Sequence, residues 1–356
     1  MEHDISSHLQ TQIKTGLDEK TSFFIQGSNS KYFYGNPVNA QSLEVNRHRG
    51  ILNYHPSELV LTARAGTPLA EIEAELKKNK QCLPFEPPHF GPNATFGGTI
   101  ASGLAGSARP FSGSVRDAVL GCRIINGQGE ILRFGGEVVK NVAGYDVSRL
   151  MTGSLGTLGL ILDISVKVLP TAPCNLTYIQ TLPASDVITT MNTLRRSTLP
   201  LSGLAYVENK LHIRLAGTQI SLAPTKNTMN GEILANDADF WHSLNEQTHP
   251  FFDAKQTLWK FSVPPATHHM ALIKESIIDW GGGLYWFFSD APRDEIDALA
   301  NTLNGHAVLF RRGEIGKTES HSFPLPPSNM QSLHENIKQA FDPQRLFNPG
   351  RMYSNI

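Results

Sequence analysis

Small residues crowd together at residues 92–106, where the sequence reads Pro-Asn-Ala-Thr-Phe-Gly-Gly-Thr-Ile-Ala-Ser-Gly-Leu-Ala-Gly. Thr95 is able to cap a helix whose first turn holds Gly97, Gly98 and Thr99, and this turn would present backbone N–H groups with little side chain in front of them. Such a turn favours an anion, and the small residues after it would let a flat or extended ligand lie along the backbone. A tight contact between a helix and a sheet produces the same pattern without a ligand, so this stretch alone leaves both interpretations open.

Two other loops are rich in small residues. Residues 27–31, Gly-Ser-Asn-Ser-Lys, follow a short predicted strand, and they suit left-handed backbone angles that present amides and hydroxyls to an anion. By itself this loop is more typical of a hairpin turn. Residues 138–159 form a longer loop that ends in glycines three apart, at Gly153, Gly156 and Gly159.

Length and charge limit the classes of function. A chain of 356 residues exceeds one ordinary core and predicts two domains, or one domain with a large insertion. Its 31 Lys and Arg residues nearly balance 32 Asp and Glu residues, so no overall field attracts nucleic acid or an anionic membrane. An anionic ligand would have to be held locally, and we expect no nucleic-acid partner.

The sequence predicts neither secretion nor direct membrane insertion. The most apolar stretch, residues 155–169, is interrupted by glycine and charged residues and is unsuited to span a bilayer. The first ten residues hold no apolar run typical of a secretory signal. The three cysteines, Cys82, Cys122 and Cys174, are widely spaced, which favours a reducing cytosol, and we interpret all three as small buried hydrophobic residues.

The residue pattern of the sequence changes at residues 170–173, which read Pro-Thr-Ala-Pro. Glycine-dense loops between short strands come before this point, and two similar runs of ordinary strands and helices follow it, which is typical of an α+β domain with helices on one sheet face. An amphipathic helix at 330–341 and a rigid turn at 346–351 are expected to pack back on the first domain. The predicted domains are residues 1–172, 173–328 and, for the returning helix and tail, 329–356.

Hydrophobic patterning also predicts individual elements. In the first domain it predicts a polar loop at 109–116, a hairpin turn at Asn126-Gly127, and strands at 21–26, 50–54, 59–64, 118–126, 130–134 and 160–169. In the second domain it predicts helices at 184–197, 267–279 and 294–303, and strands at 176–182, 204–207, 211–215, 258–263, 284–288 and 307–310.

Several common chemistries have no signature here. No Gly-x-Gly-x-x-Gly opens a helix after a strand, as a Rossmann site would require. The sequence also lacks His-Glu-x-x-His, Gly-x-Ser-x-Gly and any histidine cluster with metal spacing, so we expect no metal site.

Seven short motifs occur in order along the first half of the chain, and another closes it. They are residues 27–31 (GSNSK), 56–60 (PSELV), 65–69 (AGTPL), 94–98 (ATFGG), 115–117 (VRD), 140–146 (KNVAGYD), 153–159 (GSLGTLG) and 341–350 (FDPQRLFNPG). Together they resemble the vanillyl-alcohol-oxidase, or PCMH-type, FAD-binding domains and, within that group, the FAD-binding subunits of glycolate oxidases. The resemblance implies an α+β fold: a two-subdomain FAD-binding domain, then a smaller α+β cap or substrate-like domain, then a tail that returns to the FAD domain.

The same resemblance implies roles for individual residues. The loop at 27–31 and the helix start at 95–99 would hold the FAD pyrophosphate, residues 153–160 would lie along the adenosine and ribose, and Asn348 would lie near the isoalloxazine ring. Since no His or Cys occupies either glycine-rich cradle, FAD is expected to be non-covalent. Arg116 and Lys140 are candidate anion contacts, although surface charges would look the same. The predicted cofactor-binding residues are Gly27, Ser28, Asn29, Ser30, Lys31, Pro92, Ala94, Thr95, Gly97, Gly98, Thr99, Ser102, Gly153, Gly156, Thr157, Leu160 and Asn348.

The second domain departs from the fuller members of the group. It lacks the His-rich, Gly-Asp-Gly-Asn-like segment that supplies a metal ligand and a general base in self-contained dehydrogenases of this type. Arg311 and Arg312 follow a predicted strand and are candidates to clamp a substrate carboxylate, with His306 and His321 nearby as candidate bases. A solvated basic pair and two surface histidines would give the same pattern.

The resemblance implies a function as the FAD-binding subunit of a glycolate oxidase complex, which oxidises glycolate to glyoxylate. Its implied partners are a larger FAD-linked catalytic subunit and an iron–sulfur subunit, because the cysteines of this chain are unsuited to hold a cluster. We expect a cytoplasmic chain that meets the inner membrane peripherally, through partner subunits. Two alternatives stay open: a self-contained FAD-dependent 2-hydroxy acid dehydrogenase, and a non-catalytic, flavin-holding assembly subunit.

Overall fold

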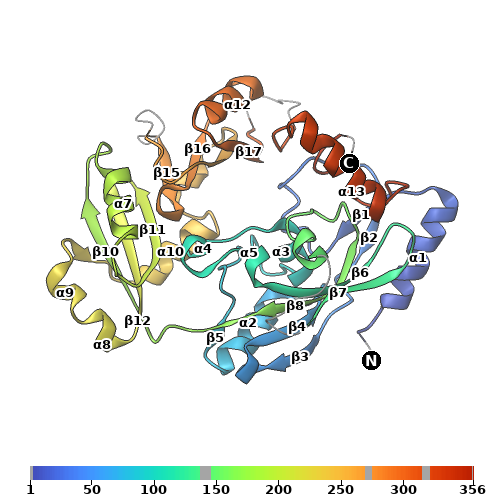
Figure 1. Cartoon of the computed structure of the whole chain (residues 1–356), viewed down its shortest axis with the longest axis horizontal. Helices are drawn as coiled ribbons and strands as arrows, with labels where there is room; N and C mark the ends of the chain where they lie inside the picture. Colours follow the sequence, from blue (N-terminus) through green and yellow to red (C-terminus); the bar gives the residue numbers. More distant parts are fainter. Residues whose placement is uncertain (1–2, 137–145, 269–274, 315–320, 355) are drawn as a thin grey trace. The chain divides into compact units, whose positions relative to one another are not determined.

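The computed structural model describes residues 3–136, 146–268, 275–314, 321–354 and 356 (Figure 1). The chain divides into two compact units, of which unit 1 comprises Met1–Leu104, Gly113–Pro170 and Leu325–Ile356, and unit 2 comprises Ala105–Ser112 and Thr171–Pro324. The sequence predicted boundaries after residues 172 and 328, and the two units meet along the chain at residues 170 and 324. The short segment Ala105–Ser112, which interrupts unit 1, was not expected to belong to unit 2.

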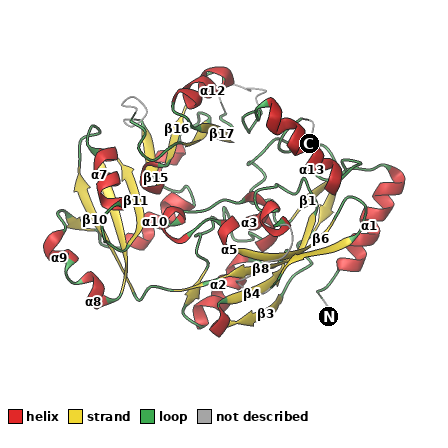
Figure 2. Cartoon of the chain, viewed as in Figure 1, coloured by secondary structure: helices red, strands yellow, loops and turns green. Residues whose placement is uncertain are grey.

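A five-stranded antiparallel sheet forms the centre of unit 1, in the order β3-β4-β8-β6-β7 (Figure 2). Its middle strand is buried on both faces, which explains its nearly continuous apolar sequence. Asp163 within that strand is paired with Arg123 and lies 3.3 Å from His48 Nε2, so the buried carboxylate keeps polar partners. The strands are β3 (Ile51–His55), β4 (Val60–Arg64), β6 (Val119–Ile125), β7 (Ile131–Gly135) and β8 (Leu160–Lys167).

Short elements surround this sheet. Two small sheets accompany it, the parallel pair β1 (Phe23–Gln26) and β2 (Gln41–Glu44) and the antiparallel pair β5 (Gln81–Cys82) and β9 (Leu169–Pro170). The helices of unit 1 are α1 (Ser6–Glu19), η1 (Pro56–Glu58), α2 (Leu69–Lys78), α3 (Phe96–Ser102), α5 (Val115–Ala118), α6 (Val147–Leu150) and α13 (Ser328–Phe341). The N-terminal helix α1 was not predicted, because its apolar stripe is narrow and polar residues occupy the rest of its surface. Among the described helices, none is both long and apolar enough to cross a membrane.

The C-terminal helix and tail belong to unit 1 and are fixed to it by a buried lysine. Lys338 is 1% exposed, and its ammonium donates to Asp342 Oδ2 at 2.8 Å, to Thr157 O at 2.6 Å and to Phe347 O at 3.1 Å. The Asp342 carboxylate also accepts from the backbone N–H groups of Leu346 and Phe347. One ion pair therefore joins α13, the turn after it and the loop that precedes β8.

The predicted hairpin between β6 and β7 is confirmed, but its glycines act differently from the expected turn. The left-handed position is Gly129, with φ of 74°, rather than Asn126 or Gly127. A Cβ atom on Gly127 would lie 2.3 Å from Asp342 Oδ1, and Gly127 N donates to Phe341 O at 2.8 Å. Gly127 is therefore required by the tail that packs on the hairpin, and not by the turn itself.

Unit 2 is built on one eight-stranded sheet in the order β13-β10-β12-β11-β15-β16-β14-β17, with every pair antiparallel. Its core packs residues of α7 and α12 against one sheet face. The strands are β10 (Cys174–Thr181), β11 (Leu201–Val207), β12 (Lys210–Gly217), β13 (Glu232–Ile233), β14 (Leu258–Ser262), β15 (Ser276–Asp279), β16 (Leu284–Phe288) and β17 (His306–Arg311). The described helices are α4 (Arg109–Ser112), α7 (Val187–Arg195), α8 (Gln219–Leu222), α9 (Thr225–Thr228), α10 (Asp237–Asn245), η2 (Pro250–Asp253), η3 (Trp280–Gly282) and α12 (Arg293–Thr302).

Three predictions about local structure were wrong. The end of the expected helix at 267–279 is strand β15, because these residues pair with β11 and β16 inside the sheet; residues 269–274 lie outside the described part. The expected polar loop at 109–116 contains the one-turn helices α4 and α5, and the Asp117 carboxylate bonds Ser114 at the start of α5. Cys82 is exposed rather than buried, since it lies in the two-residue strand β5.

Replacing the buried lysine tests its structural role. Lys338→Met leaves the Asp342 carboxylate buried without its cation, so we expect the free energy of unfolding of unit 1 to fall by about 3 kcal/mol. Urea unfolding followed by far-ultraviolet circular dichroism measures this change. Tryptophan fluorescence reports unit 2 separately, because all four tryptophans lie there.

The control is Lys78→Met, which removes a lysine that is 69% exposed and paired with Glu75. We expect its effect to stay within about 0.5 kcal/mol. Equal urea midpoints for the Lys338 variant and the wild type would contradict the structural role.

Candidate functional site

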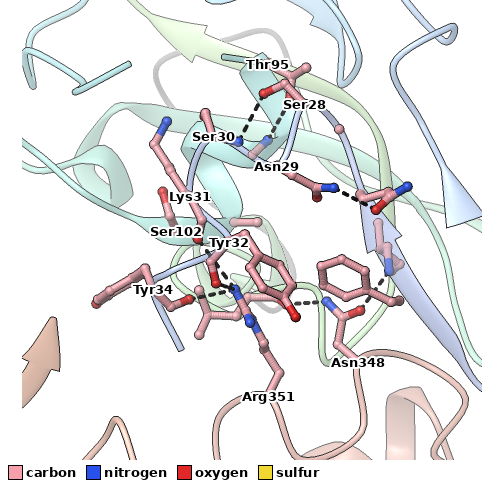
Figure 3. Close-up of a pocket in the computed structure, with 17 residues that line it drawn as sticks. Ser28, Asn29, Ser30, Lys31, Tyr32, Tyr34, Thr95, Ser102, Asn348 and Arg351 are labelled. Atoms are coloured by element: carbon pink, nitrogen blue, oxygen red, sulfur yellow. Dashed lines mark hydrogen bonds between the residues drawn. The ribbon is translucent and has the colours of Figure 1, made fainter. Parts of the chain in front are cut away.

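Three pockets in unit 1 adjoin one another, because Gly27 and Thr95 line all of them. The first follows β1 and the loop after it to α3, as Figure 3 shows. The second runs past Glu44 and Arg47, and the third enters between α3 and the loop at Leu155. We call the three together the groove; its branched, extended form suits a long ligand better than a compact one.

The loop Gly27–Ser30 supplies backbone donors at the junction of the groove. In the part of the chain that the structure describes, no protein atom accepts from the N–H groups of Gly27, Ser28 or Asn29. Asn29 has a left-handed φ of 60°, and Ser30 N donates to Ser28 Oγ at 3.4 Å. Successive amides around a left-handed residue form a concave site for an anion, so this loop has the chemistry that the sequence predicted for it.

The first turn of α3 differs from its prediction. Thr95 caps this helix, as expected, and its Oγ1 accepts from Gly98 N at 3.3 Å. However, Gly97 N donates to Ala65 O at 2.7 Å and Thr99 N to Thr95 O at 3.0 Å, so these N–H groups already have protein acceptors. The predicted row of bare amides on α3 is therefore wrong, because the segment before α2 packs against the helix and takes a donor.

The neighbouring glycines of α3 are glycine for different reasons. A Cβ atom on Gly97 would lie 2.6 Å from Ala65 Cβ and 3.0 Å from Ala65 O, so packing requires this glycine. A Cβ atom on Gly98 would meet only Thr95 Oγ1, at 3.1 Å, and Gly98 is exposed to the groove. The sequence left open whether this stretch serves close packing or ligand binding. Packing explains Gly97, and the adjacent Gly98 is open to a ligand.

Asn348 joins two walls of the groove (Figure 3). Its Oδ1 accepts from Ile25 N at 2.8 Å, and its Nδ2 donates to Leu155 O at 2.6 Å. A Cβ atom on Gly156 would lie 2.7 Å from Asn348 Nδ2, and Gly156 also has a left-handed φ of 71°. The tail asparagine therefore sets the distance between β1 and the glycine-rich loop before β8.

Arg351 is a site residue that the sequence analysis missed. The residue is 5% exposed, and its guanidinium donates to four backbone carbonyls, those of Asn36 (2.6 Å), Tyr34 (2.8 Å), Tyr32 (2.9 Å) and Lys31 (3.5 Å). Burial lowers the pKa of Arg351 to about 10, so the side chain stays charged near neutral pH. It holds the loop that follows the donor amides in one conformation. The signal available in the sequence was the tail motif, which ends immediately before this residue.

The predicted site residues divide by location. Most of them line the groove, and Lys31, which is one of these, also donates from Nζ to His89 O at 3.2 Å. The residues that line it are Gly27, Ser28, Asn29, Ser30, Lys31, Thr95, Gly97, Gly98, Ser102, Gly156 and Asn348. Those that do not line these three pockets are Pro92, Ala94, Thr99, Gly153, Thr157 and Leu160.

The candidate charges outside the groove have other surroundings. In unit 2, Arg311 Nη2 donates to Phe252 O at 2.7 Å, and Arg312 Nη2 lies 3.5 Å from Ser322 Oγ. Burial lowers the pKa of both guanidinium groups. Arg116 is an exposed residue of α5, and Lys140 lies outside the described residues.

The groove fits an anionic dinucleotide. At its junction lie three amides that have no protein acceptor among the described residues, Lys31 and Arg351 bring positive charge to the same loop, and Gly98 and Ala101 keep the opposite wall low. The pyrophosphate lies in the middle of a dinucleotide and needs hydrogen-bond donors there. The pockets that meet at Gly27 leave room for the groups at the two ends of the dinucleotide.

Comparison with known proteins agrees with this geometry. Residues 6–135 match the model of the family described as an FAD binding domain. The chain is 47% identical over 355 residues to glycolate oxidase subunit GlcE of Escherichia coli, covering 100% of this chain and 99% of that protein. It is 27% identical to a D-2-hydroxyglutarate dehydrogenase of Xanthomonas citri over 51% of this chain and 39% of that one.

A solved structure shares the fold. Alkyldihydroxyacetonephosphate synthase matches with a TM-score of 0.68 and 14% identity, over 98% of this chain and 76% of the other. This chain thus shares the fold of that synthase, and the mixed α and β architecture with an FAD binding domain is as the motifs predicted. On its full-length similarity, the chain belongs to the family of glycolate oxidase subunit GlcE, and it carries an FAD binding domain.

Proposed function

We propose that this chain binds FAD in the groove and acts as the FAD-binding subunit of a glycolate oxidase complex, in which glycolate is oxidised to glyoxylate. The observation that carries the proposal is the similarity to GlcE over the whole chain, 47% identity over 355 residues. The amides of Gly27, Ser28 and Asn29, which have no acceptor within the described part of the chain, support it independently, since they supply the donors that a pyrophosphate requires.

The chain's own residues bind and orient the cofactor. The amides of Gly27, Ser28 and Asn29 and the hydroxyls of Ser28 and Ser30 would hold the pyrophosphate, a role that we assign to this loop and not to α3. Gly98 keeps the opposite wall low, and Asn348 holds the two walls at a fixed separation. When bound, FAD supplies the acceptor for the two electrons removed from the carbon that carries the hydroxyl group.

The tail orders the site before the cofactor arrives. Lys338 fixes the turn that presents Asn348, and Arg351 fixes the loop after the donor amides through four carbonyls. A groove organised in advance loses less conformational entropy on binding, which favours tight, non-covalent FAD.

A role within a complex follows from the relative as well. The name of the E. coli protein describes it as a subunit, which supports partner chains for this one. We propose a larger FAD-linked subunit and an iron–sulfur subunit as those partners. Electrons would then leave this chain's flavin for another subunit, and association with the inner membrane would be peripheral, through the partners.

Gly98 offers a test of cofactor binding. Gly98→Val adds a branched side chain that points into the groove, and overpacking of this kind costs about 1–3 kcal/mol, so we expect FAD affinity to fall by up to about 100-fold. Visible absorbance of the purified chain measures bound flavin, and release by heat identifies it as non-covalent FAD. The smaller variant Gly98→Ala should lose less affinity, because its Cβ meets only the Thr95 hydroxyl.

Thermal unfolding of the FAD-free proteins is the control for this test. We expect Gly98→Val to unfold within a few degrees of the wild type, whereas Gly97→Val should be destabilised by its contact with Ala65. If the Gly98→Val chain binds as much flavin as the wild type, Gly98 does not contribute to FAD binding and is explained by packing alone.

Glycolate tests the reaction. Under anaerobic conditions, glycolate should bleach the visible flavin absorbance of the complex in which this chain is copurified with its partner chains. One glyoxylate should appear for each pair of electrons that the complex takes up. Turnover with an artificial acceptor by the isolated chain would favour a self-contained dehydrogenase. A flavin on this chain that stays oxidised in the active complex would favour a flavin-holding assembly subunit.

A further inference from the structure

A tryptophan in unit 2 contacts two cations. The Arg109 guanidinium carbon is 4.3 Å and the Lys260 ammonium nitrogen is 5.0 Å from the centroid of the Trp280 ring. Each contact is favourable by itself as a cation–π interaction. Two positive groups gathered at one ring repel each other, however, and an anion between them would relieve that repulsion.

The ring that both cations contact is held rigidly. Trp280 has a left-handed φ of 53°, and its indole N–H donates to Gly106 O at 3.0 Å. Asp279 accepts from Trp280 N at 2.6 Å through Oδ1 and from Ser107 Oγ at 2.7 Å through Oδ2. These bonds fasten the segment Ala105–Ser112, which carries Arg109, to the end of strand β15.

A histidine adjoins the two cations. In the sheet, Lys260 on β14 pairs with Val308 and Ser262 pairs with His306, so Lys260 and His306 are diagonal neighbours on one face. Burial lowers the pKa of His306, and the charges of Lys260 and Arg109 lower it further. Burial and then Arg109 lower the pKa of Lys260 to about 8. The three basic groups therefore influence one another directly.

Lys260 differs from two other cations of unit 2, Arg293 and Lys255, which have carboxylate partners. Arg293 also lies over a tryptophan ring, that of Trp259, but it donates to both oxygens of Asp297 at 2.8 Å. Lys255 Nζ lies 3.1 Å from Glu314. Among the described residues, no carboxylate is within ion-pair distance of Lys260, whose contact is the Trp280 ring.

We propose that Arg109, Lys260 and the Trp280 ring form a binding site for the carboxylate of a small 2-hydroxy acid. A carboxylate has two oxygens, so it can accept from an ammonium group and a guanidinium group at once. The choice of a hydroxy acid rests on the proposed function. The site also replaces Arg311 and Arg312 as our candidate for the carboxylate contact, because Arg311 donates to a backbone carbonyl and Arg312 to a serine hydroxyl.

Oxalate is the probe that tests the site. It matches glycolate in size and has no carbon–hydrogen bond to lose, so calorimetry on the FAD-loaded full chain measures binding without turnover. We expect saturable binding, displaced by glycolate and not by an equal concentration of inorganic phosphate. Lys260→Met should weaken oxalate binding about tenfold or more, while Lys260→Arg, which keeps the charge, should stay within about threefold of the wild type.

Lys255→Met is the matched control, because it removes a lysine of the same unit that already has a carboxylate partner. We expect it to bind oxalate like the wild type. Unchanged oxalate affinity in Lys260→Met, no oxalate binding by the wild type, or equal displacement by phosphate would each overturn the proposal.

Flavin reduction by glycolate separates this proposal from the proposed function. If glycolate fails to reduce the flavin of the complex but oxalate binding still depends on Lys260, the site stands and the glycolate oxidase function fails. If glycolate reduces the flavin and the Lys260→Met variant shows an unchanged KM for glycolate, the function stands and the site is overturned.

Discussion

The ion pair between Lys338 and Asp342 is the interaction on which the groove depends. A buried pair of this kind survives only when further hydrogen bonds satisfy both charges. Here the additional bonds go to the backbone of two segments outside α13: Thr157 O before β8, and Phe347 O with the N–H groups of Leu346 and Phe347 in the tail. The pair therefore does more than fasten a helix. It places Asn348 where that side chain can reach β1 and the glycine-rich loop at once, and so it determines the width of the groove.

The glycines of unit 1 serve two separate purposes. At Gly97, Gly127 and Gly156 an added Cβ atom would lie within 3 Å of other protein atoms, so these glycines permit close packing of α3, the tail and the loop before β8. Gly98 is the exception, open toward the groove. The amides that we propose as anion donors are elsewhere, on Gly27, Ser28 and Asn29, and they have no protein acceptor among the described residues. Close packing and ligand binding thus share one sequence pattern because both need backbone without side chains.

Unit 2 carries the carboxylate site that we propose. Its sheet carries a lysine that has no carboxylate partner in the described part of the chain, and a rigid indole holds a second cation beside it. The segment Ala105–Ser112 contributes Arg109. In the chain, only Gly103 and Leu104 separate this segment from α3, the helix that lines the groove. If a hydroxy acid binds there, this subunit takes part in substrate recognition as well as in holding flavin, which gives its short second unit a function of its own.

Local sequence determined much of this protein. The short motifs indicated the FAD-binding fold, alternation and apolar runs predicted most strands, and Thr95 was recognised as a cap, because each of these depends on neighbours along the chain. Only the tertiary structure decided which amides are available to a ligand, why Gly127 and Gly97 are glycine, that residues 276–279 form a strand, and that Arg351 and Lys338 order the site. Each of these depends on a partner far away in sequence: Ala65 accepts from the N–H group of Gly97, β11 pairs with β15, and the tail supplies cations to loops more than 150 residues earlier.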